Sequence, residues 1–197
     1  PAQETQSSPR DPRLGYWFAH PHLVGSPMRI DITGRDGSAS FDCRDDQEIL
    51  FGGLAAGIGL PYECGTGSCA SCKATLEAGT VDHGWPDAPA RRLISQEKNE
   101  ILMCQARPRE DCRVTIRGKM PEPNHIVPRS VDGVIASATS LNHNVLRLVI
   151  RPDVPMPYDA GQFMLVDTPD VPGYRGWSMA TYDPAAETLT FTGKMMP

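Results

Sequence analysis

Two patterns of hydrophobic and polar positions divide the chain into two parts. In the first part, alternating segments at 28–34 and 38–44 flank the turn sequence Arg-Asp-Gly, which predicts a β-hairpin. Residues 45–59 follow with apolar positions at helical spacing and glycines at the end, which predicts a helix. Together with two further expected strands, these elements predict an α+β unit. The two strands are expected at 72–79 and 112–118.

The second part contains short alternating segments separated by Pro, Gly, Asp and Asn, with no amphipathic helix between them. This pattern is typical of an antiparallel all-β barrel or sandwich. The expected strands lie within 132–140, 144–151, 161–169, 175–182 and 187–194.

Composition shifts predict the domain boundaries. Residues 1–27 are rich in Pro, Ser and Gln and are interpreted as a flexible leader. The α+β unit occupies 28–118. Residues 119–128 contain three prolines in ten residues, which suits a semi-rigid connector. The all-β part occupies 129–197.

Charge and composition exclude several functional classes. The 197 residues carry a net charge of -5 and have no basic tract, so no nucleic-acid partner is expected. No apolar run approaches the roughly 20 residues of a membrane span, so no membrane association is expected. Six cysteines without a secretory signal favour the reducing cytoplasm. One group of acidic residues is interpreted as an ordinary solvated face, or alternatively as a surface that steers docking to a basic partner. It comprises Asp42, Asp45, Asp46 and Glu48.

The cysteines carry the strongest chemical signal. Cys64, Cys69 and Cys72 form C-x4-C-x2-C, and Cys104 follows after 31 intervening residues, which is the plant-type [2Fe–2S] spacing. A cluster with bridging sulfides carries negative charge that backbone N–H groups can offset. Small residues between the cysteines let the backbone wrap that closely.

Two other uses of these thiols fit less well. Structural zinc sites usually contain paired Cys-x2-Cys knuckles, and only one is present here. A disulfide framework is expected in smaller, secreted, core-poor chains. Cys43 and Cys112 fall on the apolar side of their expected strands and are interpreted as small buried hydrophobic residues.

The sequence at 60–79, LPYECGTGSCASCKATLEAG, and at 101–108, ILMCQARP, resembles the ferredoxin module of bacterial oxygenase reductases. The resemblance covers the α+β unit and implies a β-grasp fold. It also implies the set of ligands for the [2Fe–2S] cluster and an oxygenase component as the protein partner. The implied ligands are Cys64, Cys69, Cys72 and Cys104.

The all-β part is similar to the flavin-binding barrel of the ferredoxin–NADP reductase superfamily, whose signature is Arg-x-Tyr-Ser. Here Arg175 would pair with the FAD pyrophosphate and Trp177 would lie against the isoalloxazine. Ser178 would donate a hydrogen bond near the flavin N5. Trp in place of Tyr keeps the aromatic face but removes the phenol hydroxyl. An ungapped match of residues 191–197, FTGKMMP, to a cofactor-contacting strand of that family further implies Thr192, Gly193 and Lys194.

These resemblances predict a reductase that passes electrons from NAD(P)H through FAD and a [2Fe–2S] cluster to an oxygenase acting on aromatic or similar compounds. The oxygenase would be a di-iron monooxygenase or a Rieske dioxygenase. The sequence stops where the family would continue, so the flavin barrel is expected to be incomplete and the NAD(P)H site to lie outside these residues. No acid–base catalytic residue is expected. The alternative is a non-enzymatic ferredoxin-type electron carrier with a β-barrel that docks a partner.

Overall fold

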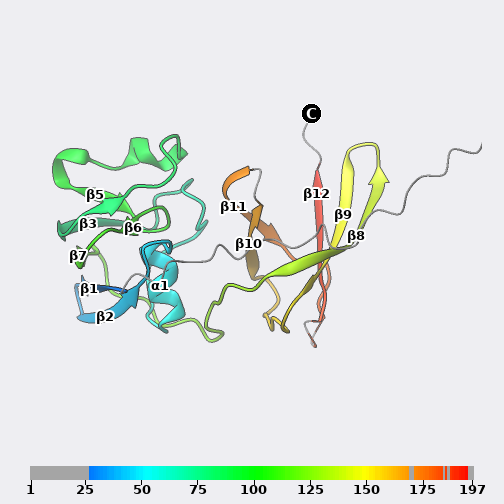
Figure 1. The fold of residues 1–197 in the computed structure, drawn as a ribbon, viewed down its shortest axis with the longest axis horizontal. Helices are drawn as coiled ribbons and strands as arrows, with labels where there is room; N and C mark the ends of the chain where they lie inside the picture. The colour runs from blue at the N-terminus through cyan, green and yellow to red at the C-terminus, as the bar shows by residue number, and fades with distance from the viewer. Residues whose placement is uncertain (1–26, 169–170, 184, 186, 195–197) are drawn as a thin grey trace, which may run out of the picture.

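The computed structural model describes residues 27–168, 171–183, 185 and 187–194. Nearly all of the expected leader, residues 1–27, lies outside the described residues. The described chain forms two lobes side by side, each built around its own β-sheets, with the connector running between them (Figure 1). Among the described residues, no helix combines the length and apolarity needed to cross a membrane.

The first lobe is a five-stranded mixed sheet with strand order β2-β1-β7-β3-β5. Only the β1–β7 pair is parallel, and the other neighbours are antiparallel. The predicted hairpin is confirmed, and so are the strands expected at 72–79 and 112–118. The five strands are β1 (Met28–Gly34), β2 (Gly37–Cys43), β3 (Lys73–Ala78), β5 (Glu100–Leu102) and β7 (Cys112–Thr115).

Shorter elements complete this lobe. The predicted helix is present as α1 (Ile49–Ala55), and the chain leaves it through Gly57, whose positive φ of 75° ends the helix. A small second sheet and two 3₁₀ helices follow: β4 (Val81–Asp82) with β6 (Arg107–Pro108), η1 (Pro89–Leu93) and η2 (Gln96–Lys98).

The core of the first lobe lies between the sheet and α1. Alternation along β1 directs Ile30 and Ile32 inward, where both are fully buried, and α1 contributes Leu50 and Leu54. Each such side chain contributes roughly 1.5–3 kcal/mol by leaving water. Gly53 lets α1 pack closely against Leu60 and Phe41, since a Cβ at this position would lie 2.5 Å from Leu60 Cδ1 and 3.1 Å from Phe41 Cζ.

The second lobe contains two antiparallel sheets. One has the strand order β12-β9-β8, and the other pairs β10 with β11. All five strands expected in this part are therefore present. They are β8 (Gly133–Asn142), β9 (Val145–Pro152), β10 (Phe163–Thr168), β11 (Val171–Ser178) and β12 (Leu189–Lys194).

The barrel expected for the second lobe is not closed within the described residues. A barrel requires a continuous ladder of strand pairs, whereas the two sheets meet only at an isolated bridge between Met179 and Phe191. The core is correspondingly small, with buried apolar side chains at Tyr158, Leu189 and Phe191. The observed architecture is thus a mixed-sheet domain followed by open antiparallel sheets.

The connector lies against the first lobe. The Met120 backbone N–H donates to Asp36 Oδ1 at 2.9 Å, and Asn124 Nδ2 donates to the Tyr62 hydroxyl at 3.4 Å. At Gly59 a Cβ would lie 1.8 Å from the Pro121 carbonyl oxygen, so only glycine permits this approach. These contacts fix the point from which the chain enters the second lobe.

Candidate functional site

The cysteine loop connects α1 to β3 and curls around its own thiols. Gly65, Gly67 and Ala70 all have positive φ, between 63° and 79°. This curvature directs backbone N–H groups at sulfur: those of Thr66 and Ser68 both lie 3.4 Å from Cys64 Sγ. The small residues between the cysteines permit this close wrapping of the backbone, as expected from the sequence.

Sheet pairing brings the distant fourth cysteine to the loop. Lys73 of β3 pairs with Leu102 of β5, and the Met103 N–H donates to the Cys72 carbonyl at 3.2 Å. As a result, Cys72 Sγ and Cys104 Sγ lie 3.3 Å apart in the buried wall of the loop.

The four thiols form two pairs. Cys72 Sγ lies 3.3 Å from Cys104 Sγ, and the Cys69 thiol is close enough to Cys64 to lower its pKa. Within the described residues, no three His, Cys, Asp or Glu side chains converge closely enough to hold a single metal ion. A structural zinc ion would require four ligands around one point. A [2Fe–2S] cluster has four thiolates divided between two irons, and two pairs of thiols agree with that donor set.

Hydrogen bonds lower the pKa of two of the four proposed ligands, Cys64 and Cys72, and raise the pKa of Cys104. Burial alone would raise the pKa of Cys64, but hydrogen bonds from Thr66, Cys69 and Ser68 outweigh it and lower this pKa to about 7. The pKa of Cys72 is lowered because Cys104 shares a proton with it, and the pKa of Cys104 is raised for the same reason. A bound metal would displace these protons.

The two remaining cysteines lie apart from the loop and are buried, as predicted. Burial is the largest cause that raises the pKa of Cys43 to about 12 and that of Cys112 to about 11. Both thiols stay protonated and donate to backbone carbonyls, Cys43 to Gln47 at 3.4 Å and Cys112 to Glu110 at 3.2 Å. They are small apolar side chains of the core.

The residues proposed for the flavin come from two strands that the structure places side by side. An isolated bridge pairs Met179 with Phe191. Met179 is the residue after Ser178, and Phe191 is the residue before Thr192, so the bridge brings the two groups of proposed flavin residues together. The Trp177 ring contacts Phe191 with centroids 5.5 Å apart and is half-buried in the small core. The exposed end of β12, with Gly193 and Lys194, completes this edge.

Arg175 is exposed on β11, and its Nη1 donates to the carbonyls of Gly173 and Tyr174 at 3.3 and 3.2 Å. The guanidinium therefore lies along its own strand. Its position at the surface agrees with a group that receives an anion from outside the lobe.

The cysteine loop lies directly against the strand with the flavin motif. A Cβ built on Gly65 would lie 3.0 Å from Leu165 Cδ1 of β10, and one built on Gly176 would lie 4.0 Å from the Cys64 carbonyl oxygen. No local pattern in the sequence indicates this contact, because Gly65 and Leu165 are 100 residues apart and Cys64 and Gly176 are 112 residues apart. It brings the two predicted cofactor sites together.

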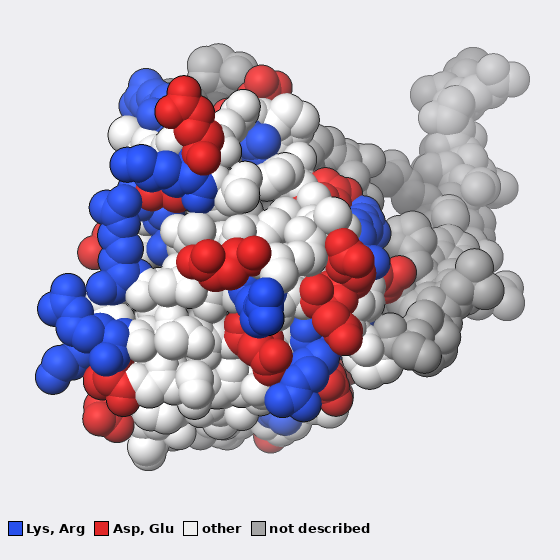
Figure 2. Space-filling view, turned by 90° about the vertical axis from the view of Figure 1, so that its left-hand side faces the viewer, with Lys and Arg blue, Asp and Glu red and all other residues white. Residues whose placement is uncertain are grey.

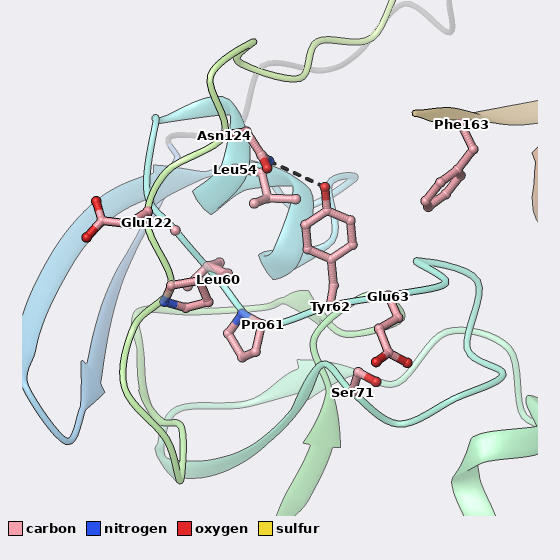
Figure 3. Close-up of a pocket in the computed structure, with 11 residues that line it drawn as sticks. Leu54, Leu60, Pro61, Tyr62, Glu63, Ser71, Glu122, Asn124 and Phe163 are labelled. Carbon is pink, nitrogen blue, oxygen red and sulfur yellow. Dashed lines mark hydrogen bonds between the residues drawn. The ribbon is translucent and has the colours of Figure 1, made fainter. Parts of the chain in front are cut away.

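A cavity of about 480 Å³ opens beside this contact (Figure 3). Tyr62 and Leu54 of the first lobe, Asn124 of the connector and Phe163 of β10 line it, and Phe163 projects toward it from the second lobe. Ser71, between Cys69 and Cys72, also lines it, so the cavity lies at the junction between the lobes and borders the cysteine loop.

The acidic residues considered as a docking surface do not form a uniform patch. Glu48 is only 4% exposed, and Asp46 accepts a hydrogen bond from Arg44 at 2.9 Å. On the outer face of the first lobe, acidic and basic side chains are interspersed (Figure 2). This supports the solvated-face interpretation for the exposed members and removes Glu48 from the group.

Comparisons with known proteins also indicate an iron–sulfur domain in the first lobe. Residues 32–109 match the family of the 2Fe-2S iron-sulfur cluster binding domain. The ferredoxin–NAD(+) reductase component of the alkene monooxygenase system of Xanthobacter autotrophicus is 38% identical over 150 residues, covering 75% of this chain and 45% of that protein. The phenol 2-monooxygenase reductase component of a Pseudomonas species is 30% identical over 156 residues, covering 78% and 44%.

Among solved structures, the ferredoxin reductase in carbazole 1,9a-dioxygenase matches with a TM-score of 0.75 at 31% identity. That match covers 88% of this chain and 54% of the other. The described sheets of both lobes therefore have a counterpart in an experimentally determined reductase.

The fold and the cysteine loop define the first lobe as a 2Fe-2S iron-sulfur cluster binding domain, the family to which residues 32–109 belong. The chain as a whole matches the reductase components of bacterial oxygenase systems. It contains their N-terminal cluster domain and part of their FAD-binding domain. It spans about half the length of the curated relatives that it matches.

Proposed function

We propose that this chain belongs to the electron-transfer component of a bacterial oxygenase system, with Cys64, Cys69, Cys72 and Cys104 as ligands of a [2Fe–2S] cluster. The observation that carries the proposal is the set of paired thiols in a loop lying directly on the strand with Arg175 and Trp177. When bound, FAD would supply the conversion of a hydride from NAD(P)H into single electrons for the cluster.

The residues of this chain would bind and position the two groups. Arg175 would pair with a pyrophosphate oxygen, Trp177 would form an apolar wall for the ring system, and Ser178 would donate a hydrogen bond. The edge at Thr192, Gly193 and Lys194 would contact the cofactor through the β12 backbone. The N–H groups of the cysteine loop would offset the negative charge of the cluster.

The partner would be an oxygenase component. The relatives include the reductase components of an alkene and a phenol monooxygenase and the reductase of a carbazole dioxygenase. Both a di-iron monooxygenase and a Rieske dioxygenase therefore remain in the proposal, with aromatic or similar compounds as substrates. The six free cysteines suit a reducing compartment, and we place the protein in the cytoplasm.

Anaerobic reconstitution of the whole chain with iron and sulfide tests the cluster. Two irons and two acid-labile sulfides per chain are expected, with a paramagnetic signal after one-electron reduction. Replacing any of the four ligands by Ala should abolish the colour. The matched variants Cys43→Ala and Cys112→Ala should retain it, because those thiols lie outside the loop. Stoichiometric zinc without sulfide would refute the assignment.

Titration with FAD tests the flavin residues and separates the reductase from a carrier without flavin. Arg175→Ala should weaken FAD binding roughly 10–100-fold, the effect of losing a charge-assisted hydrogen bond of about 1.5–3 kcal/mol. Arg151→Ala, on β9 and paired across to Val134, is the matched control and should bind like the unchanged chain. Because the two sheets of this lobe do not close within the described residues, FAD binding is expected to be weak, and equal affinities for the two variants would contradict this role.

A further inference from the structure

Tyr174 links the two lobes. It lies on β11, immediately before Arg175, but its side chain reaches the first lobe. Its ring meets Phe51 of α1 edge to face, with centroids 5.3 Å apart and an interplanar angle of 88°. Its hydroxyl donates to Glu48 Oε2 at 3.4 Å. One side chain therefore makes both an aromatic and a polar contact across the junction.

The acceptor of this bond is itself held rigidly. Glu48 Oε1 accepts two hydrogen bonds from Arg107, from Nη2 at 2.7 Å and from Nε at 3.0 Å. One carboxylate oxygen of Glu48 thus accepts hydrogen bonds within the first lobe, and the other accepts the hydrogen bond from the second lobe. Burial is the largest cause that raises the pKa of Tyr174, so the phenol stays protonated and remains a donor.

This anchor belongs to the frame that holds the fourth cysteine. The N–H groups of Ile49 and Leu50, at the start of α1, donate to the carbonyls of Ala106 and Met103 at 2.9 and 3.0 Å. These two carbonyls flank Cys104 on the chain. A displacement of Glu48 would therefore also move the segment that contains this thiol.

Two residues beyond Tyr174, Gly176 lies against the Cys64 carbonyl. We propose that Tyr174 is a positioning residue that holds the flavin-motif strand against the cluster loop. This role rests on the proposed function, since electron tunnelling falls steeply with distance and a fixed contact sets the separation of the two cofactors. Without such an anchor, two domains joined by a connector move relative to one another by default.

The test uses the whole chain with its reconstituted cluster. Tyr174→Ala removes both contacts, while Tyr174→Phe keeps the ring and removes only the hydroxyl. Tyr182→Ala is the matched control, a tyrosine of the same lobe that is 62% exposed and makes its ring contact with Tyr158 of that lobe. Nuclear magnetic resonance then measures how the reduced, paramagnetic cluster broadens the signals of Gly176 and Leu165.

In the unchanged chain and in Tyr182→Ala, both second-lobe signals should broaden on reduction. In Tyr174→Ala this broadening should be lost, while the signals of Gly65 and Thr66 in the cysteine loop stay broad. Tyr174→Phe should show an intermediate loss. Retained broadening of Gly176 in Tyr174→Ala would overturn the role of Tyr174, because the lobes would stay docked without it.

A second measurement does not need the cluster. Small-angle scattering of the iron-free chain should show a larger radius of gyration for Tyr174→Ala than for Tyr182→Ala, with unchanged circular dichroism. Equal radii would overturn the proposal. A chain that assembles no cluster would count against the proposed function alone, since the scattering comparison would still decide the role of Tyr174.

Discussion

Selective alkylation of the iron-free protein tests the electrostatics of the cysteine loop. We expect iodoacetamide to modify Cys64 first, with a half-maximal rate near pH 7. The thiolate is the reactive form, and hydrogen bonds in the loop lower the pKa of Cys64 to about 7 despite its partial burial. Below this pH the thiol takes up its proton, so the rate should fall as the pH falls.

The expected selectivity follows from the three pKa values. At pH 7, about half of Cys64 is thiolate, against a fraction of about 10⁻⁵ for Cys43 with a pKa of about 12 and about 10⁻⁴ for Cys112 with a pKa of about 11. The thiolates of Cys43 and Cys112 are more basic and therefore better nucleophiles, which raises their reaction rates by about two orders of magnitude and partly offsets their low thiolate fractions. Cys64 should therefore react roughly a hundredfold faster than either, before the burial of Cys43 and Cys112 slows them further.

The assay is mass spectrometry of peptides from protein quenched at successive times over a series of pH values. Denaturant should abolish the selectivity, because all six cysteines then become ordinary exposed thiols. Iron and sulfide should protect Cys64 while leaving the slow reaction of Cys112 unchanged. Alkylation of Cys43 or Cys112 as fast as that of Cys64 in the folded protein would refute this reasoning.

Three further outcomes are expected. Gly79→Ala should lower the free energy of unfolding by about 1–3 kcal/mol, because φ is 93° and the new Cβ would lie 2.4 Å from the Asp111 carbonyl oxygen; urea unfolding should show no comparable loss for Gly118→Ala, which has open space around it. Leu50→Ala should cost about 2–5 kcal/mol in the same assay, whereas the exposed Leu93→Ala should stay within about 0.5 kcal/mol. A fragment ending at Lys119 should fold and assemble the cluster alone, a prediction that an insoluble or colourless fragment would contradict.

Much of the first lobe could be predicted because its signals are local. Alternation at 28–43 and the turn between the two strands are enough to define the hairpin, and C-x4-C-x2-C is a local spacing that indicates its own chemistry. The strand β5 was missed, since its three residues are all buried and show no alternation. A strand buried on both faces has no period by which to recognise it.

The strands of the second lobe were equally visible in the sequence, but their closure was not. Alternation says which face of a strand is apolar and gives no information on which edges pair. In the structure the two sheets meet at a single bridge, and the expected barrel stays open within the described residues.

The sequence alone determined the candidate residues for the chemistry: four cysteines with the spacing of a cluster, and an Arg-x-Trp-Ser segment in an expected strand. Only the tertiary structure decided that Cys72 pairs with Cys104, that Glu48 is buried, and that the loop touches the flavin-motif strand. The physical reason is the difference in sequence separation between local signals and tertiary contacts. Spacing and periodicity act over a few residues, whereas these contacts join segments separated by 32 residues or more, whose approach is set by sheet pairing and side-chain packing.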